Sequence, residues 1–250
     1  MDKYLLYDET LNIKDYYTID QIIEKIKKNP SNKYYKYINN NEILINNKLV
    51  CNTLFIAHRI NKLEEVNNIP NIFGVEIDLR DNYLNNELIL SHDPFNNGEN
   101  FEDYIKNFQN KTIILNIKSE RIEIRCLELL KKYNIIDYFF LDSSFPMIYL
   151  LNTKYSENNI ACRFSEFEPI NNYLINSNMT KWVWVDCFTK QPLTYDIYNK
   201  IKELNGKICI VSPELQGQIE KIEIYKKYFD DNNIFPNAIC CKIYNIIKWI

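Results

Sequence analysis

Short apolar runs recur along the chain from residue 54 onward and alternate with segments whose apolar residues repeat as on one face of a helix. The runs are rich in β-branched and aromatic residues, which favours strands. They lie at 54–58, 74–79, 87–91, 112–118, 138–142, 160–164, 182–186, 208–212 and 238–242. Helical spacing is clearest at 120–134, 145–155, 194–206 and 220–233.

This alternation predicts an α/β fold. If 87–91 is a hairpin partner inside one connection, eight strands alternate with helices, as in a (β/α)8 TIM-type barrel. An open doubly wound sheet is the structural alternative. Residues 1–50 do not share the pattern: 17–30 is typical of a helix and 33–50 of a polar hairpin. We therefore predict an N-terminal helix/hairpin extension at 1–50 and a barrel at 51–250.

Two carboxylates share one face of the strand predicted at 74–79. Because alternate residues of a strand point the same way, Val75, Ile77 and Leu79 lie on one face, and Glu76 and Asp78 on the other. In isolation this is the pattern of an edge strand with one wet face. In a barrel strand the carboxylates point inward, where unpaired charge costs several kcal/mol. They then require a cation.

Oxygen ligands of this kind suit a hard divalent ion such as Mg²⁺ or Ca²⁺, which keeps positions open for a substrate phosphate. Asn116 and Lys118 share one face of the strand at 112–118. Asn116 offers a neutral oxygen to the metal, and Lys118 a fixed positive charge to phosphate. The alternative for both residues is an ordinary polar strand end.

The chain has only two histidines, His58 and His92, and both follow predicted strands. In barrel enzymes the site is built at the carboxyl ends of the strands. Two imidazoles can divide acid–base work between an attacking hydroxyl and a leaving oxygen, while Arg59 and Lys118 stabilise charge on phosphoryl oxygens. A lone histidine is otherwise more often structural.

The segments "AHR" at 57–59, "EID" at 76–78 and "SHDP" at 91–94 resemble the HR…ExD…HD signature of the glycerophosphodiester phosphodiesterases. These enzymes belong to the wider phosphatidylinositol-phospholipase-C-like phosphodiesterases. The resemblance implies cleavage of a small-molecule phosphodiester with Ca²⁺ or Mg²⁺. It assigns acid–base catalysis to His58 and His92, phosphate contact to Arg59, metal binding to Glu76 and Asp78, and an orienting role to Asp93.

The sequence departs from that family at two positions. Ile60 stands where the family usually has glycine, and Asn116 where a further acidic ligand is common. These departures support a second reading, a catalytically silent barrel that binds a phosphorylated ligand or a partner protein. A glycosidase using Glu76 and another acid is a third, but it leaves the histidines unexplained.

Further polar or aromatic residues lie at or just past other strand ends and are candidates for a substrate pocket: Arg163, Trp184, Asp186, Glu214 and Lys242. Alternatively, the charged residues are ordinary surface side chains at the starts of loops, and Trp184 is a core residue.

Composition narrows the function classes. A net charge of -3 gives no general attraction to nucleic acid, so no nucleic-acid partner is expected. The seven cysteines have no CxxC spacing and are expected to be buried reduced thiols. Without a signal-peptide-like start or a spanning apolar run, we expect a cytoplasmic protein with no stable membrane insertion. The oligomeric state is left open.

Overall fold

The computed structural model describes residues 53–249, with gaps at 70, 72, 83–84, 86 and 111, together with the backbone of five earlier strands. These strands are β1 (Tyr4–Tyr7), β2 (Ile13–Tyr17), β3 (Tyr34–Ile38), β4 (Glu42–Ile45) and β5 (Lys48–Cys51). They form an antiparallel sheet in the order β2-β1-β3-β4-β5. The predicted hairpin corresponds to β3, β4 and β5, whereas the predicted helix lies, except for its first residue, outside the described residues. The domain boundary at residue 50 stays a prediction.

The rest of the chain is built on parallel strands that match the eight predicted ones. They are β6 (Leu54–Ala57), β7 (Gly74–Asp81), β10 (Ile113–Ile117), β11 (Tyr138–Leu141), β12 (Ala161–Phe164), β13 (Trp182–Val185), β14 (Lys207–Val211) and β15 (Ala238–Cys241). Their order is β11-β10-β7-β6-β15-β14-β13-β12. As predicted, the segment near 87–91 is a hairpin partner: β8 (Leu88–Leu90) runs antiparallel to β7 and also pairs with β9 (Glu99–Asn100).

The two ends of this strand order meet at one point. A single parallel bridge pairs Phe140 of β11 with Ile160 beside β12, and the Phe140 amide donates a 2.8 Å hydrogen bond to the Asn159 carbonyl. The α/β class is confirmed. A barrel closed by a continuous ladder between β11 and β12 stays a prediction.

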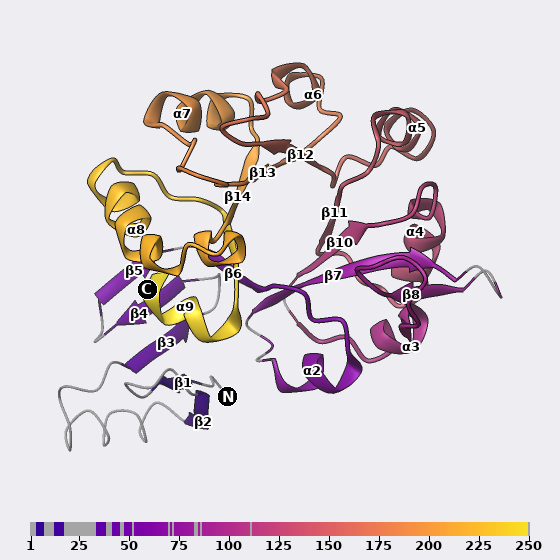
Figure 1. Cartoon of the computed structure of the whole chain (residues 1–250), viewed down its shortest axis with the longest axis horizontal. Coiled ribbons are helices and arrows are strands. Elements are labelled where there is room, and N and C mark those ends of the chain that lie inside the picture. The colour runs from indigo at the N-terminus through magenta and orange to yellow at the C-terminus, as the bar shows by residue number, and fades with distance from the viewer. Residues whose placement is uncertain are drawn as a thin grey trace.

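Helices follow most of the strands and lie around their outside (Figure 1). They are α2 (Leu63–Asn68), α3 (Phe101–Ile105), α4 (Glu123–Lys132), α5 (Phe145–Tyr155), α6 (Asn172–Asn176), α7 (Tyr195–Glu203), α8 (Ile222–Asp231) and α9 (Ile246–Trp249), with short 3-10 helices at η1 (Pro213–Gln216), η2 (Ile219–Lys221) and η3 (Ile243–Asn245). The four predicted helical segments contain α4, α5, α7 and α8. Helices α2, α3 and α6 have only five or six residues, too few to establish a helical period.

Strand alternation creates two apolar layers. Val75, Ile77 and Leu79 belong to the larger cluster, which includes residues of the surrounding helices. A smaller cluster joins the opposite faces of the other strands and contains Leu54, Ile56, Ile114, Phe139, Leu141, Ala161, Trp182, Trp184, Cys209, Val211, Ala238 and Cys240. On that inner face β7 supplies Glu76 and Asp78 instead of apolar side chains. The predicted orientation of this strand is therefore correct.

The cysteines also follow expectation. The six whose side chains are described, Cys126, Cys162, Cys187, Cys209, Cys240 and Cys241, are all buried and free. Within the described part of the chain, no helix combines the length and apolarity needed to cross a membrane.

Candidate active site

The turn after β6 brings the first histidine to the carboxylates of β7. His58 follows the last residue of β6, and Arg59 then adopts a left-handed backbone with φ of 58°. In this conformation the Arg59 amide donates a 2.7 Å hydrogen bond to Glu76 Oε2. The next amide, that of Ile60, donates to the Glu76 carbonyl at 2.8 Å. The turn is therefore held on β7 by consecutive backbone amides.

Glu76 accepts a hydrogen bond at each of its two carboxylate oxygens. Its side chain is 1% exposed, and Asn116 Nδ2 donates to its Oε1 at 2.9 Å. Burial, followed by repulsion from Asp78, raises the pKa of Glu76 to about 7. Removal of this repulsion requires a cation or a proton.

Asp78 is fully buried and is surrounded by nitrogen donors. Asn61 makes a reciprocal pair with it: Asn61 Nδ2 donates to Asp78 Oδ2 at 2.9 Å, and the Asp78 amide donates to Asn61 Oδ1 at 2.8 Å. Arg59 Nε lies 3.4 Å from Asp78 Oδ2, and Lys118 Nζ lies 3.7 Å from Oδ1. Fixed positive charge thus compensates part of the buried negative charge.

Two buried oxygens at this point lack a hydrogen-bond donor. They are Asp78 Oδ1 and Asn116 Oδ1, and the two residues face each other in the β7–β10 register. Orphaned buried oxygens are costly unless a donor or cation satisfies them. Carboxylate and amide oxygens of this kind are the ligands that Mg²⁺ or Ca²⁺ prefers, but Asn116 turns its Nδ2 toward Glu76, so a shared metal would require the Asn116 amide to rotate. No group of three or more His, Cys, Asp or Glu side chains arranged to hold a metal occurs among the described residues, so any such site depends on the Asn116 carboxamide.

His58 lies between negative and positive groups. Its Nε2 is 3.8 Å from Glu76 Oε2, and its Nδ1 is 3.3 Å from Lys242 Nζ. Burial, reinforced by the positive charges of Lys242 and Arg59, lowers the pKa of His58 to about 3. The imidazole is therefore neutral at physiological pH.

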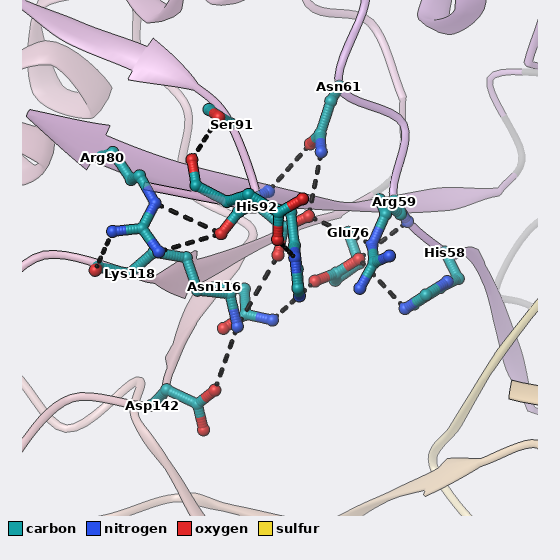
Figure 2. Close-up of polar contacts among 12 residues, drawn as sticks. His58, Arg59, Asn61, Glu76, Arg80, Ser91, His92, Asn116, Lys118 and Asp142 are labelled. Atoms are coloured by element: carbon teal, nitrogen blue, oxygen red, sulfur yellow. Dashed lines mark hydrogen bonds and ion pairs between the residues drawn. The ribbon is translucent and has the colours of Figure 1, made fainter. Parts of the chain in front are cut away.

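His92 is more exposed and has a carboxylate partner. Its Nδ1 lies 2.7 Å from Asp93 Oδ1, and this contact lowers the pKa of Asp93. The His92 carbonyl accepts from Arg80 Nε at 3.2 Å and Nη2 at 2.9 Å, while Arg80 Nη1 donates to the Lys118 carbonyl at 2.8 Å. Arg80 thereby joins the His92 loop to the end of β10 beside the site (Figure 2).

A chain of ion pairs continues from the carboxylates along the neighbouring strand ends. Lys118 Nζ lies 3.4 Å from Asp142 Oδ2, a contact visible in Figure 2. Asp142 also accepts from Arg163 Nε at 2.6 Å and Nη2 at 2.9 Å, and Arg163 Nη1 contacts Asp186. A cavity of about 490 Å³ opens beside Asp142 and Arg163.

The remaining pocket candidates fall into two places. Trp184 is 4% exposed and belongs to the inner apolar cluster, so its ring is not at the surface. Glu214 accepts the Lys242 amide at 3.0 Å, and Lys242 reaches His58. The structure thus brings Lys242 and Glu214 to the first histidine, and Arg163 and Asp186 to the ion-pair chain.

Asn61 and Asp142 are the site residues that the sequence patterns did not single out. Asn61 follows the histidine–arginine pair closely, and Asp142 ends a predicted strand. Strand-end position was a usable signal for Asp142. No spacing rule predicts the pairing of Asn61 with Asp78, because it depends on the path of the turn.

The fold and the site define a class: an α/β protein with parallel strands, whose candidate active site combines two imidazoles, paired buried carboxylates and cations at the strand ends. No family model and no curated protein matches the sequence. Solved structures do match. A glycerophosphodiester phosphodiesterase from Agrobacterium tumefaciens has a TM-score of 0.57 at 10% identity, with 75% of this chain and 96% of that chain covered.

Two other structures give similar values. An Oleispira antarctica phosphodiesterase in complex with the product sn-glycerol-3-phosphate has a TM-score of 0.56 at 13% identity, covering 77% of this chain and 93% of that one. A glycerophosphoryl diester phosphodiesterase from Parabacteroides distasonis has a TM-score of 0.56 at 12% identity, covering 99% and 94%. The chain therefore has the fold of the glycerophosphodiester phosphodiesterases, the family that its motifs resemble.

Proposed function

We propose that the protein is a metal-dependent phosphoric diester hydrolase of the glycerophosphodiester phosphodiesterase type. The observation that carries the proposal is the geometry of its two histidines. His58 Nε2 lies 3.8 Å from Glu76 Oε2, and the neighbouring buried carboxylate, that of Asp78, contacts Arg59 and Lys118. His92 has its own carboxylate partner, Asp93. These contacts support a site in which the two histidines serve as acid–base groups and Arg59 and Lys118 bind phosphate.

The hydrogen bonds suggest how the histidines divide the work. Because the Asp93 carboxylate can only accept a hydrogen bond, a neutral His92 ring carries its proton on Nδ1 and keeps the lone pair of its other ring nitrogen. His92 is thus placed to take the proton of the attacking water or hydroxyl. His58, which faces the carboxylates, is placed to serve the leaving oxygen.

Arg59 and Lys118 supply the phosphate contacts. Both lie near Asp78 without a short, fully paired contact to it, at 3.4 and 3.7 Å, and the Arg59 side chain is 43% exposed. Glu76, Asp78 and Asn116 would hold Mg²⁺ or Ca²⁺, which when bound polarises a phosphoryl oxygen. The substrate we propose is a small-molecule phosphodiester with an alkyl leaving group, by analogy with the product held by the Oleispira protein.

The experiment is an assay of the purified protein on an aryl phosphodiester and on glycerophosphodiesters, with EDTA and with added Mg²⁺ or Ca²⁺. We expect metal-dependent turnover that falls roughly 100-fold or more in His58→Ala, His92→Ala and Glu76→Ala. Glu123→Gln, a buried carboxylate outside the site, is the control and keeps activity. Activity that survives removal of both histidines would refute the assignment.

One observation favours a second candidate function, a silent barrel that binds a phosphorylated ligand. Lys118 already lies 3.7 Å from Asp78 Oδ1, where it partly replaces the charge that a metal would bring. This second function predicts that the protein binds glycerol phosphate but hydrolyses no diester, whether Mg²⁺ or Ca²⁺ is present.

A further inference from the structure

A chain of hydrogen bonds connects the C-terminal helix to the first histidine. Trp249 Nε1 of α9 donates to Ser212 Oγ at 2.7 Å, and the Ser212 hydroxyl donates to Glu214 Oε2. The other Glu214 oxygen accepts the Lys242 amide at 3.0 Å. The Lys242 ammonium then lies 3.3 Å from His58 Nδ1. Ser212 and Trp249 are buried, so the chain is anchored in the core.

The donor inventory fixes the direction of its last contact. A lysine ammonium has three donors and no acceptor, so His58 Nδ1 must accept from it. A neutral imidazole has one N–H group, and that group is then at Nε2. This nitrogen faces Glu76 Oε2 at 3.8 Å. The ring nitrogen that points toward the carboxylates therefore carries the proton.

His92 has the opposite arrangement. A carboxylate can only accept, so the Asp93 contact places the proton of His92 on Nδ1. When both rings are neutral, partners of opposite charge therefore favour different tautomers, an ammonium for His58 and a carboxylate for His92.

We propose that Lys242 is a positioning residue that holds neutral His58 in the Nε2–H tautomer, with Glu214 fixing the lysine backbone. The role of this tautomer in the reaction rests on the proposed phosphodiesterase function. The tautomer assignment itself does not depend on that function. It gives Lys242 a role in presenting a proton, in place of the substrate-pocket role that the sequence suggested.

The consequence for the reaction is a balanced proton path. As the P–O bond to the leaving group breaks, the leaving oxygen takes the proton from His58 Nε2, and Nδ1 takes one from the Lys242 ammonium. The imidazole stays neutral throughout and changes tautomer. His92 meanwhile holds the proton taken from the nucleophile and releases it to solvent after product release. His58 Nδ1 then returns its proton to Lys242 while Nε2 takes one from solvent, which restores the starting tautomer.

The chain is well suited to a direct test because it has only two histidines. Protein labelled with ¹⁵N-histidine gives two pairs of ring nitrogens, whose chemical shifts report each tautomer. We expect Nε2–H for His58 and Nδ1–H for His92. In Lys242→Met the Nε2–H preference of His58 is lost and His92 is unchanged, whereas Lys242→Arg, which keeps a cationic donor, retains the preference.

Activity provides the second readout. An alkyl leaving group needs a proton, but p-nitrophenolate does not. Lys242→Met should therefore lose roughly 100-fold on a glycerophosphodiester and far less on bis(p-nitrophenyl) phosphate. Lys227→Met, at an exposed lysine on α8 paired with Asp231, is the control and changes neither.

The outcomes separate the two proposals. If the tautomers are as expected but no diester is turned over, the proposed function is refuted. The role of Lys242 as a positioning residue is then retained. A wild-type His58 with its proton on Nδ1, or a tautomer unchanged in a folded Lys242→Met, overturns the inference. An equal loss on both substrates overturns the proton path.

Discussion

Substitution of Glu76 by glutamine should change how the stability of the protein depends on pH. Burial and the neighbouring Asp78 charge raise the pKa of Glu76 from 4.5 to about 7. The folded state therefore holds this proton more tightly than the unfolded state. The resulting stabilisation is complete below about pH 4.5 and is lost as the pH rises through 7.

The size of the effect follows from linkage. One pKa unit corresponds to about 1.4 kcal/mol, so a shift of this size makes wild type lose about 2.5 kcal/mol from this group between pH 5 and pH 8. Glutamine has no such proton, and its amide keeps both contacts: its oxygen can accept from Arg59, and its nitrogen can donate to Asn116 after a flip of that side chain. His58 titrates with the opposite sign, because its pKa is lowered to about 3. It is present in both proteins and cancels in their difference.

The assay is urea unfolding at 25 °C in EDTA at pH 5, 6, 7 and 8, followed by tryptophan fluorescence. We expect Glu76→Gln to gain about 2.5 kcal/mol relative to wild type from pH 5 to pH 8. Saturating Mg²⁺ or Ca²⁺ should stabilise wild type at pH 8 and reduce that gain. Glu123→Gln removes another buried carboxyl with a raised pKa and should show no metal dependence. Parallel pH profiles for wild type and Glu76→Gln would refute the reasoning.

Three other changes test separate parts of the structure. Asp93→Asn removes the acceptor of the His92 Nδ1 proton and should lower kcat by roughly tenfold or more, with the His92 tautomer altered in the ¹⁵N spectrum. In Gly98→Ala the new Cβ would lie 2.2 Å from the Leu90 carbonyl oxygen; we expect a loss of about 1–3 kcal/mol in urea unfolding. Asn116→Glu adds a third carboxylate and should tighten Ca²⁺ binding by calorimetry while lowering Tm in EDTA; unchanged affinity would argue against a metal at this position.

Much of the fold follows from local patterns. The parallel strands were predicted because each is a short apolar run that stands apart from the polar turns around it. The inward direction of Glu76 and Asp78 follows from the two-residue period of β7, and their burial follows from the position of β7 in the sheet. The two histidines were predicted to be catalytic because they are the only ones in the chain and both follow strands, where such folds place their sites; this role stays a prediction.

The finer contacts had no such signal. They depend on backbone conformations that non-glycine residues adopt infrequently, such as the left-handed φ of 58° at Arg59 and 65° at Asp142. A sequence pattern assigns faces to strands, but it does not place the residues that follow them. The contacts of Asn61 and the ion pairs of Arg163 with Asp142 and Asp186 arise at this level.

The arrangement of charge separates the cations that are free to meet a phosphate from those that are not. The Arg163 guanidinium makes a bidentate contact with Asp142 and a further one with Asp186, so a ligand must break partly buried ion pairs to engage it. Lys118 is shared between Asp78 and Asp142 at 3.7 and 3.4 Å, beyond ordinary hydrogen-bond distance to the first. If the proposed function holds, a phosphoryl oxygen would therefore recruit Lys118 at lower cost than Arg163, and the Arg163 contacts would hold Asp142 in place to receive the lysine when the phosphate leaves.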